Sequence, residues 1–126
     1  MPGNVRGLDL ISYSPWIDLG DMHAMPYRDD SWDVIIMGWV IAYSNNPKKA
    51  AHEVIRVAKN EAIIAVAAEY RGEADGAEGQ FNTIKSVHKI LSFFEGHVDK
   101  VYFNHDVSTA SGQFIESNSV IFSIKK

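Results

Sequence analysis

The chain contains no cysteine among its 126 residues. This absence excludes disulfide bonds, thiolate metal ligands and cysteine nucleophiles, and it fits a reducing compartment. The N-terminus has no apolar stretch typical of a secretion signal. No apolar run approaches about 18 residues, the length that a membrane-spanning helix requires. We therefore expect a soluble, cytoplasmic protein that does not insert into a membrane.

Basic side chains are scarce as well. Twelve basic residues against 16 acidic ones leave a net charge of −4, and no basic cluster extends beyond the pairs Lys48-Lys49 and Lys125-Lys126. Since a surface that binds nucleic acid needs a basic face, we expect no nucleic-acid partner. The five histidines share no segment and no helical i,i+4 spacing, so we expect no metal site. A hydrolytic triad of His105, Asp106 and Ser108 is rejected, because adjacent residues on a strand point to opposite faces.

The composition is that of a folded globular domain. Hydrophobic residues make up 46% of the chain and charged residues 22%, which argues against wholesale disorder. A chain of 126 residues has room for one hydrophobic core. We find no internal repeat and no linker, so residues 1–126 are expected to form a single domain.

Short apolar runs rich in β-branched residues predict the strands. The expected strands are Val5–Ile11, Trp16–Gly20, Asp33–Met37, Ala62–Ala68, Val98–Phe103 and Ser119–Ile124. The segment Gly38–Tyr43 should form an irregular turn or a short helix. The connection between the last two strands is too short and too polar for a crossover helix, so we expect this pair to be antiparallel.

Two helices are expected between these strands. Asn46 is a typical helix cap and Pro47 a typical first helical residue, so a helix should begin there, with Asn60 as its left-handed stop. The second helix should begin at Asn82 or Thr83 and end at Gly96. The order of elements is therefore β-β-β-α-β-α-β-β, an α/β protein.

Polar and aromatic residues follow the expected strands. Because crossover helices make neighbouring strands parallel, the carboxyl ends of these strands meet at one rim, where open α/β sheets bind small molecules. The residues at these ends are Asp9, Asp21, Gly38, Trp39, Glu69 and Tyr70.

Structural roles are the alternative for each of these residues. The two aspartates could cap loops or pair with Arg6 or Arg28. Trp39 and Tyr43 could be core or interface residues, and Met22 could simply fill a gap in the core. Only the position of all these residues at one rim favours a ligand site.

Five short segments keep a particular order and spacing. They are Gly7–Asp9, Gly20–Pro26, Trp32–Val34, the helix led by Pro47, and Glu53–Val57. In this order the segments resemble the class I S-adenosylmethionine-dependent methyltransferases of the small-molecule type. The match covers most of residues 5–69, and the helix-strand-strand ending is also similar to that family.

The resemblance implies roles for the candidate residues. On the cofactor side, Asp9 would hold the ribose hydroxyls of S-adenosylmethionine, and Asp21 would lie near the adenine amino group. Met22 would supply a backbone contact to the adenine ring, and Gly38 would also line the cofactor.

On the acceptor side, the resemblance implies that Trp39, Tyr43 and Tyr70 line the site for a small-molecule methyl acceptor. Glu69 is the one candidate for a catalytic base. Catalysis would consist mainly of aligning the acceptor with the methyl group.

The chain departs from the family pattern in three places. It begins eight residues before Asp9, so the family's first strand, its glycine-rich loop and the helix after that loop are expected to be missing. The helix between the second and third family strands is also missing, and Lys59–Ala62 replaces the usual Lys-Pro-Gly-Gly turn. We expect a truncated Rossmann-like sheet, mostly parallel with an antiparallel C-terminal hairpin and with helices mainly on one face. The strands ending at Asp9 and Gly38 would either leave a gap or pair directly.

A parallel sheet with one bare apolar face is unstable in water, so we expect a homodimer or a partner chain to cover that face. Two functions follow as alternatives. One is a small-molecule methyltransferase domain, and the other is a catalytically inactive remnant that dimerises or binds a partner. A fragment of a nicotinamide-dinucleotide domain is a weaker third, because it does not explain Gly20-Asp21.

Overall fold

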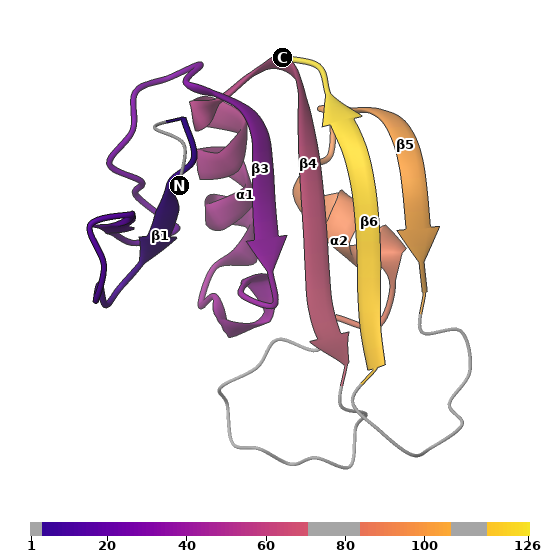
Figure 1. The fold of residues 1–126 in the computed structure, drawn as a ribbon. Coiled ribbons are helices and arrows are strands. Elements are labelled where there is room, and N and C mark those ends of the chain that lie inside the picture. The colour runs from indigo at the N-terminus through magenta and orange to yellow at the C-terminus, as the bar shows by residue number, and fades with distance from the viewer. Residues whose placement is uncertain (1–3, 71–83, 107–115) are drawn as a thin grey trace.

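The computed structural model of the chain describes residues 4–70, 84–106 and 116–126. Figure 1 shows a main sheet with a smaller N-terminal strand unit beside it. Neither helix in these residues is long and apolar enough to cross a membrane.

Four strands form the main sheet. They are β3 (Trp32–Gly38), β4 (Ala58–Tyr70), β5 (Val98–His105) and β6 (Glu116–Ile124), in the spatial order β3-β4-β6-β5. β3 and β4 pair in parallel, whereas β6 is antiparallel to both of its neighbours, so it alone of the four runs against the others (Figure 1). This arrangement confirms the predicted sheet with an antiparallel C-terminal hairpin.

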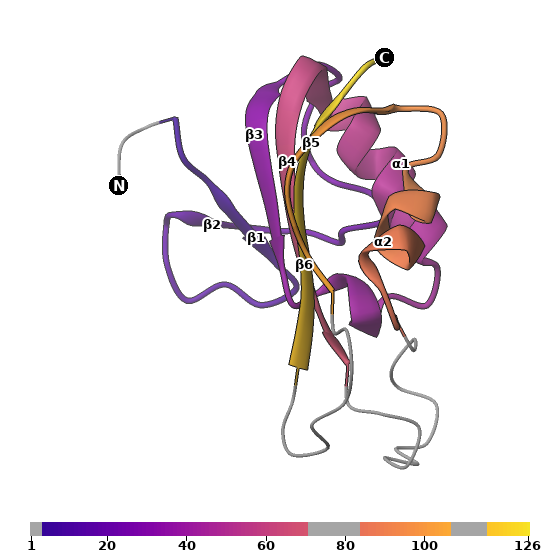
Figure 2. The ribbon, with the colours of Figure 1, turned by 90° about the vertical axis from the view of Figure 1, so that its right-hand side faces the viewer.

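Both α-helices cover the same face of this sheet. Figure 2 shows α1 (Pro47–Val57) and α2 (Val87–Phe93) on one side, with the N-terminal strands toward the other. In the central part of β4, every second residue from Ala62 to Ala68 is buried beneath the helices, as the period of a strand requires. The largest fully buried side chains include Ile41, Val54, Ile64, Ile90, Phe94 and Phe122. The last two meet edge to face with ring centroids 5.1 Å apart.

The first two strands form a sheet of their own. β1 (Gly7–Asp9) and β2 (Ile17–Leu19) pair in parallel and are not hydrogen-bonded to β3 in the described part of the chain. Of the two expected outcomes, a gap and direct pairing, the structure has the gap. A Cβ atom on Gly20 would lie 2.7 Å from Leu8 Cδ1 and 2.9 Å from Pro26 Cδ, so a larger residue after β2 would have to displace both side chains.

The helix α1 begins as predicted but ends differently. Asn46 caps it, since its side chain accepts a hydrogen bond from the Lys49 amide at 3.1 Å, and Pro47 is the first helical residue. The prediction of Asn60 as a left-handed stop was wrong. Residue Ala58 is already extended and β4 starts there, and the left-handed residue is Glu61, with φ of 67°.

The helix α2 is shorter than predicted. Residues 84–86 are not helical, and the expected starts at Asn82 and Thr83 lie outside the described residues. Ser86 caps the helix by accepting a hydrogen bond from the Lys89 amide at 3.1 Å. In addition, Asp106 Oδ1 accepts a hydrogen bond from the Val87 amide at 2.6 Å, which fixes the first turn.

Two side chains of α1 hold the loop between β2 and β3. Glu53 Oε1 accepts a hydrogen bond from the Met25 amide at 2.8 Å, and the Arg56 guanidinium donates to both carboxylate oxygens of Glu53. The same guanidinium donates to the Tyr27 and Met25 carbonyls, at 2.9 and 3.1 Å, and to Asp29 Oδ1 at 2.8 Å. This fork anchors the loop to the helix.

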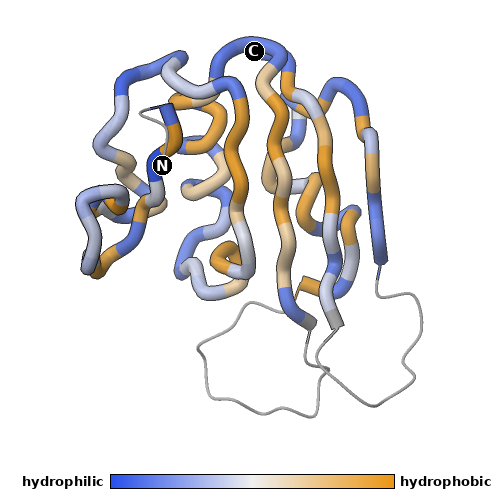
Figure 3. Tube along the Cα trace, in the orientation of Figure 1, coloured by the Kyte–Doolittle hydropathy of each residue, from blue (hydrophilic) through white to orange (hydrophobic). Residues whose placement is uncertain are grey.

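The sheet face opposite the helices carries an apolar row. Ile36, Ala65, Ile121 and Phe103 are register partners across β3, β4, β6 and β5, so their side chains share this face. Ile36 is 75% exposed and Phe103 51% exposed. Figure 3 shows that hydrophobic residues are frequent along the traces of these central strands. We call these four residues, together with Val34, the bare face.

Breaking the hydrogen-bonded fork of Glu53 and Arg56 should lower the stability of the protein measurably. Replacing Arg56 by Gln should lower the free energy of unfolding by about 2 kcal/mol, because Glu53 and two backbone carbonyls lose their partner. Hydrogen bonds from Arg56 lower the pKa of Glu53, so the carboxylate stabilises the fold above its ordinary pKa and stops doing so as the pH falls. The effect of the substitution should therefore be largest near neutral pH and smaller in acid.

Urea unfolding at several pH values measures this effect. Lys48→Gln, an exposed change on the same helix, is the control and should stay within about 0.5 kcal/mol of the parent. Equal stability of the Arg56→Gln variant and the control at neutral pH would contradict the assignment.

Candidate functional site

Asp9 and Asp21 lie at the carboxyl ends of two neighbouring parallel strands. Asp9 is the last residue of β1, and Asp21 stands two residues beyond the end of β2. The Gly20 amide donates a hydrogen bond to the Asp9 carbonyl at 2.9 Å, which ties the two strand ends together. The structure therefore brings both predicted acids to one edge of the small sheet.

The Asp9 carboxylate is exposed and makes only local contacts among the described residues. Its Oδ1 accepts hydrogen bonds from the Leu10 amide at 2.7 Å and the Ile11 amide at 3.5 Å. These bonds fix the turn after β1 and orient the carboxylate without neutralising it. The alternative that Asp9 pairs with Arg6 is not realised, because Arg6 pairs with Asp18.

Asp21 has a partner that the sequence analysis missed. Its Oδ1 accepts hydrogen bonds from the His23 amide at 2.8 Å and from the His23 ring Nδ1 at 2.5 Å. These bonds, the amide first, lower the pKa of the Asp21 carboxyl. The other ring nitrogen, Nε2, lies 2.6 Å from Ser44 Oγ. An acid with a histidine two residues on was the only signal of the first contact, and nothing in the sequence pointed to Ser44.

The carboxyl end of β3 has an unusual backbone. Gly38 ends the strand, and a Cβ atom there would meet nothing within 4 Å. Trp39 has a positive φ of 63°, a conformation that is costly for a bulky residue, and its amide donates to the Ala67 carbonyl at 2.9 Å. The Trp39 side chain is 44% exposed, and Tyr43 on η1 (Ile41–Tyr43) is 52% exposed. Both are therefore surface aromatics rather than core residues.

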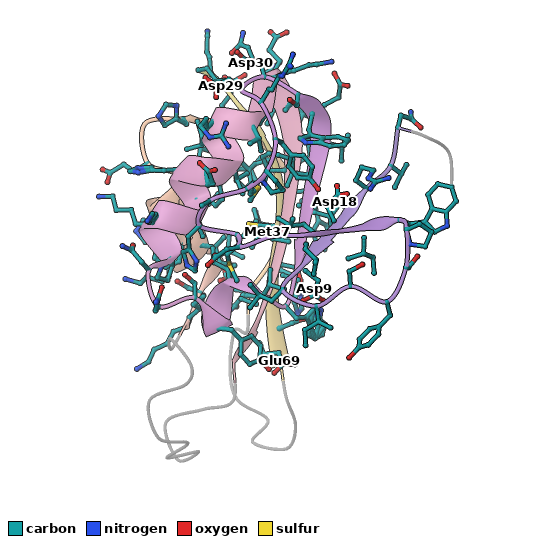
Figure 4. The ribbon with its side chains drawn as sticks, turned by 90° about the vertical axis from the view of Figure 1, so that its left-hand side faces the viewer. Asp9, Asp18, Asp29, Asp30, Met37 and Glu69 are labelled. Carbon is teal, nitrogen blue, oxygen red and sulfur yellow. The ribbon has the colours of Figure 1, made fainter. Side chains whose placement is uncertain are left out.

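Glu69 and Tyr70 lie at the end of β4. Glu69 is half-buried, and Figure 4 shows it toward the same end of the molecule as Asp9. The side chain of Tyr70 lies outside the described residues. Met22 is partly buried and packs against the core, which agrees with the core-filling role considered for it above.

A second acidic group lies away from this rim. Asp18 pairs with Arg6 and accepts a hydrogen bond from the Tyr27 hydroxyl at 2.8 Å. In Figure 4, Asp18 lies higher than Asp9 and closer to Asp29 and Asp30. Burial, and then the bond to Asp18, raises the pKa of Tyr27 to about 12. This group stabilises the loop and is not part of the candidate site.

The arrangement suits a polar, uncharged or cationic ligand. Two outward-facing carboxylates can accept hydrogen bonds from hydroxyl and amino groups. Exposed aromatic rings at the neighbouring strand end can stack on an organic group. The described residues contain no group of three side chains that could hold a metal ion.

Comparison with known proteins adds a family match. Residues 6–66 match the family model of a methyltransferase domain. No curated protein sequence matches the chain.

Several solved structures share the fold. A methyltransferase dependent on S-adenosylmethionine, from Thermotoga maritima, superposes with a TM-score of 0.62 at 17% identity, covering 87% of this chain and 64% of that protein. A chain from the complex between the Haloferax volcanii methyltransferase activator Trm112 and a methyltransferase gives 0.61 at 13% identity, covering 87% and 61%. The cyclase SpnF gives 0.59 at 22% identity, covering 73% and 34%. The chain thus spans between a third and two thirds of the length of these proteins.

The Tyr27 environment gives a prediction about alkaline pH. With its pKa raised to about 12, Tyr27 should still be protonated at about pH 11, where an ordinary tyrosine, with a pKa near 10, is ionised. Because the folded state then binds a proton that the unfolded state has lost, stability should fall as the pH rises above about 10. Asp18→Asn should lower the pKa of Tyr27 only in part, because burial is the larger cause.

Ring-carbon NMR of the tyrosines across this range measures the pKa directly. Ionisation of Tyr27 together with an ordinary tyrosine near pH 10 would show that the ring is not buried against Asp18 as described.

Proposed function

We propose that the chain is a class I S-adenosylmethionine-dependent methyltransferase that transfers a methyl group to a small-molecule acceptor. The match of residues 6–66 to a methyltransferase domain, and the fold shared with a methyltransferase dependent on S-adenosylmethionine, support this proposal. The observation that carries the proposal is the position of Asp9 and Asp21 at the ends of two paired parallel strands. The family match also favours methyl transfer over a nicotinamide-dinucleotide fragment. The absence of cysteine suits a reducing compartment, so we propose the cytoplasm as its location.

The cofactor side consists of four residues. Asp9 would accept hydrogen bonds from ribose hydroxyls, and Asp21 would accept one from the adenine amino group. The Met22 backbone would border the adenine ring, and the open space at Gly38 leaves room for the cofactor. The donor and acceptor chemistry of these groups fits a nucleoside. When bound, S-adenosylmethionine supplies the activated methyl group.

The acceptor side lies at the ends of β3 and β4. Trp39 and Tyr43 would stack on the acceptor, with Tyr70 beside them, and hold it in line with the methyl group. Glu69 would take the proton from the acceptor atom that receives the methyl group. The left-handed backbone at Trp39 supports this role, because such strain is typical of functional positions.

Calorimetry with S-adenosylhomocysteine, the demethylated product, tests the cofactor site. The parent chain should bind it, and Asp9→Ala and Asp21→Ala should each weaken binding by about tenfold or more, because each removes a charged acceptor. Asp99→Ala, an exposed acid on β5, is the matched control and should bind like the parent. Absence of heat at millimolar ligand would contradict methyl transfer by this chain.

The bare face supports a second function, binding of another polypeptide. Its apolar row crosses all four strands of the main sheet, and such a surface is costly to leave in water. We propose a second copy of this chain as the occupant, giving a homodimer. One similar structure comes from a complex with a methyltransferase activator, which supports partner binding as a property to test. The inactive remnant of a methyltransferase would retain this function alone.

Sedimentation velocity at tens of micromolar tests this interface. We expect a dimer for the parent chain and a monomer for Ile36→Lys, because Ile36 is the most exposed residue of the row and a lysine buried in its place would be costly. Lys48→Gln is the control, since Lys48 is exposed on α1, which lies on the opposite side of the sheet (Figure 2). A compact monomer of the parent chain at this concentration would contradict the proposal.

A further inference from the structure

Asp21, His23 and Ser44 form a chain of hydrogen bonds between two distant parts of the sequence. The His23 ring reaches Asp21 Oδ1 through Nδ1, at 2.5 Å, and Ser44 Oγ through Nε2, at 2.6 Å. Asp21 follows β2, whereas Ser44 directly follows η1 in the connection from β3 to α1. This ring is therefore a direct link between the predicted cofactor side and the segment that carries the acceptor-side aromatics.

The Ser44 end of the link is fixed and buried. Ser44 is 2% exposed, and its Oγ also accepts a hydrogen bond from the Asn46 amide at 3.0 Å. Asn46 in turn caps α1. The imidazole satisfies both contacts whether it is neutral or protonated, because Nε2 can accept from the serine hydroxyl or donate to its oxygen. The link is thus anchored at the start of α1.

The Asp21 end is open to solvent. The Asp21 side chain is 55% exposed, while the His23 side chain is only 16% exposed. Because Oδ1 accepts both His23 hydrogen bonds, these bonds restrict the orientation of the carboxylate. A ligand that meets Asp21 therefore meets a pre-oriented acceptor.

The order of groups, acid, histidine and serine, is also that of a hydrolytic triad. A nucleophilic serine must reach a substrate carbonyl, however, and must have its hydroxyl activated by the histidine. Ser44 is buried, and its oxygen already accepts a backbone hydrogen bond. The histidine here orients the acid, and the serine anchors the histidine.

We propose that His23 is a positioning residue that holds the Asp21 carboxylate for the amino group of a nucleoside and couples it, through Ser44, to the β3–α1 connection. The ligand part rests on the proposed function, whereas the coupling between Asp21 and Ser44 does not. The coupling means that a change at Asp21 alters the segment that bears Trp39 and Tyr43.

Two substitutions of His23 separate the two contacts. Asn places an amide nitrogen near the position of Nδ1 and keeps a donor for Asp21, while Gln places it near Nε2 and keeps a contact to Ser44. For S-adenosylhomocysteine measured by calorimetry, His23→Asn should stay within about threefold of the parent, and His23→Gln should bind about fivefold more weakly or worse. His52→Gln, an exposed histidine on α1, should bind like the parent. Equal affinities for the Asn and Gln variants would overturn the positioning role.

A ligand-free measurement keeps the coupling separate from the proposed function. In amide NMR spectra, Asp21→Asn should shift the resonances of Ser44 and Asn46 in the parent background. The same change should leave them nearly unmoved in the His23→Asn background, where the contact to Ser44 is cut. Unmoved resonances in the parent, or equal shifts in both backgrounds, would overturn the coupling. If the parent chain binds no S-adenosylhomocysteine, the proposed function fails, and this measurement still decides the coupling.

Discussion

The hydrogen-bonded fork of Glu53 and Arg56 is the contact on which the geometry of the site depends. The loop from β2 to β3 contains no helix of its own, and the small β1-β2 sheet is not hydrogen-bonded to the main sheet among the described residues. Arg56 binds two carbonyls and one carboxylate of that loop, and Glu53 binds the Met25 amide. The loop, and with it Asp21, is therefore positioned by α1.

Two further contacts, one before and one after Asp21 in the chain, position the rim that carries Asp9 and Asp21. On one side, Gly20 permits close packing against Leu8 and Pro26, and its amide bonds to the Asp9 carbonyl. On the other side, His23 reaches Ser44 at the start of α1. The rim therefore takes its shape from α1 and the loop it holds, rather than from a continuous sheet. The bare face is the complementary consequence, because both helices lie on the opposite side (Figure 2).

The sequence predicted the order of elements because each carries a local signal. Apolar β-branched runs marked the strands, and Asn46 with Pro47 marked the start of α1. The sequence did not predict the helix ends that depend on contacts with residues distant in the chain. The stop expected at Asn60 was overridden because the chain becomes extended at Ala58 and joins β4 directly. The start of α2 depends on Ser86 and on Asp106, which binds the Val87 amide and lies 19 residues after Val87 in the chain.

The candidate site was predictable in the same limited way. Asp9 and Asp21 could be predicted as site residues because each stands at the end of a short apolar run and is preceded closely by a glycine, in Gly7-Leu8-Asp9 and Gly20-Asp21. Their neighbours could not, since His23 and Ser44 meet across 21 residues of sequence. The pairing of Arg6 with Asp18 rather than with Asp9 could not be predicted either, because the sequence offers several acids as partners and only the fold selects one.

In the function proposed above, the edge formed by Asp9 and Asp21 binds a nucleoside. A crystal structure of the chain with S-adenosylhomocysteine tests this directly. We expect electron density for the adenosine at this edge, with the ribose hydroxyls within hydrogen-bond distance of the Asp9 carboxylate and the adenine amino group beside Asp21. Density elsewhere on the molecule, with both carboxylates facing solvent, would contradict it.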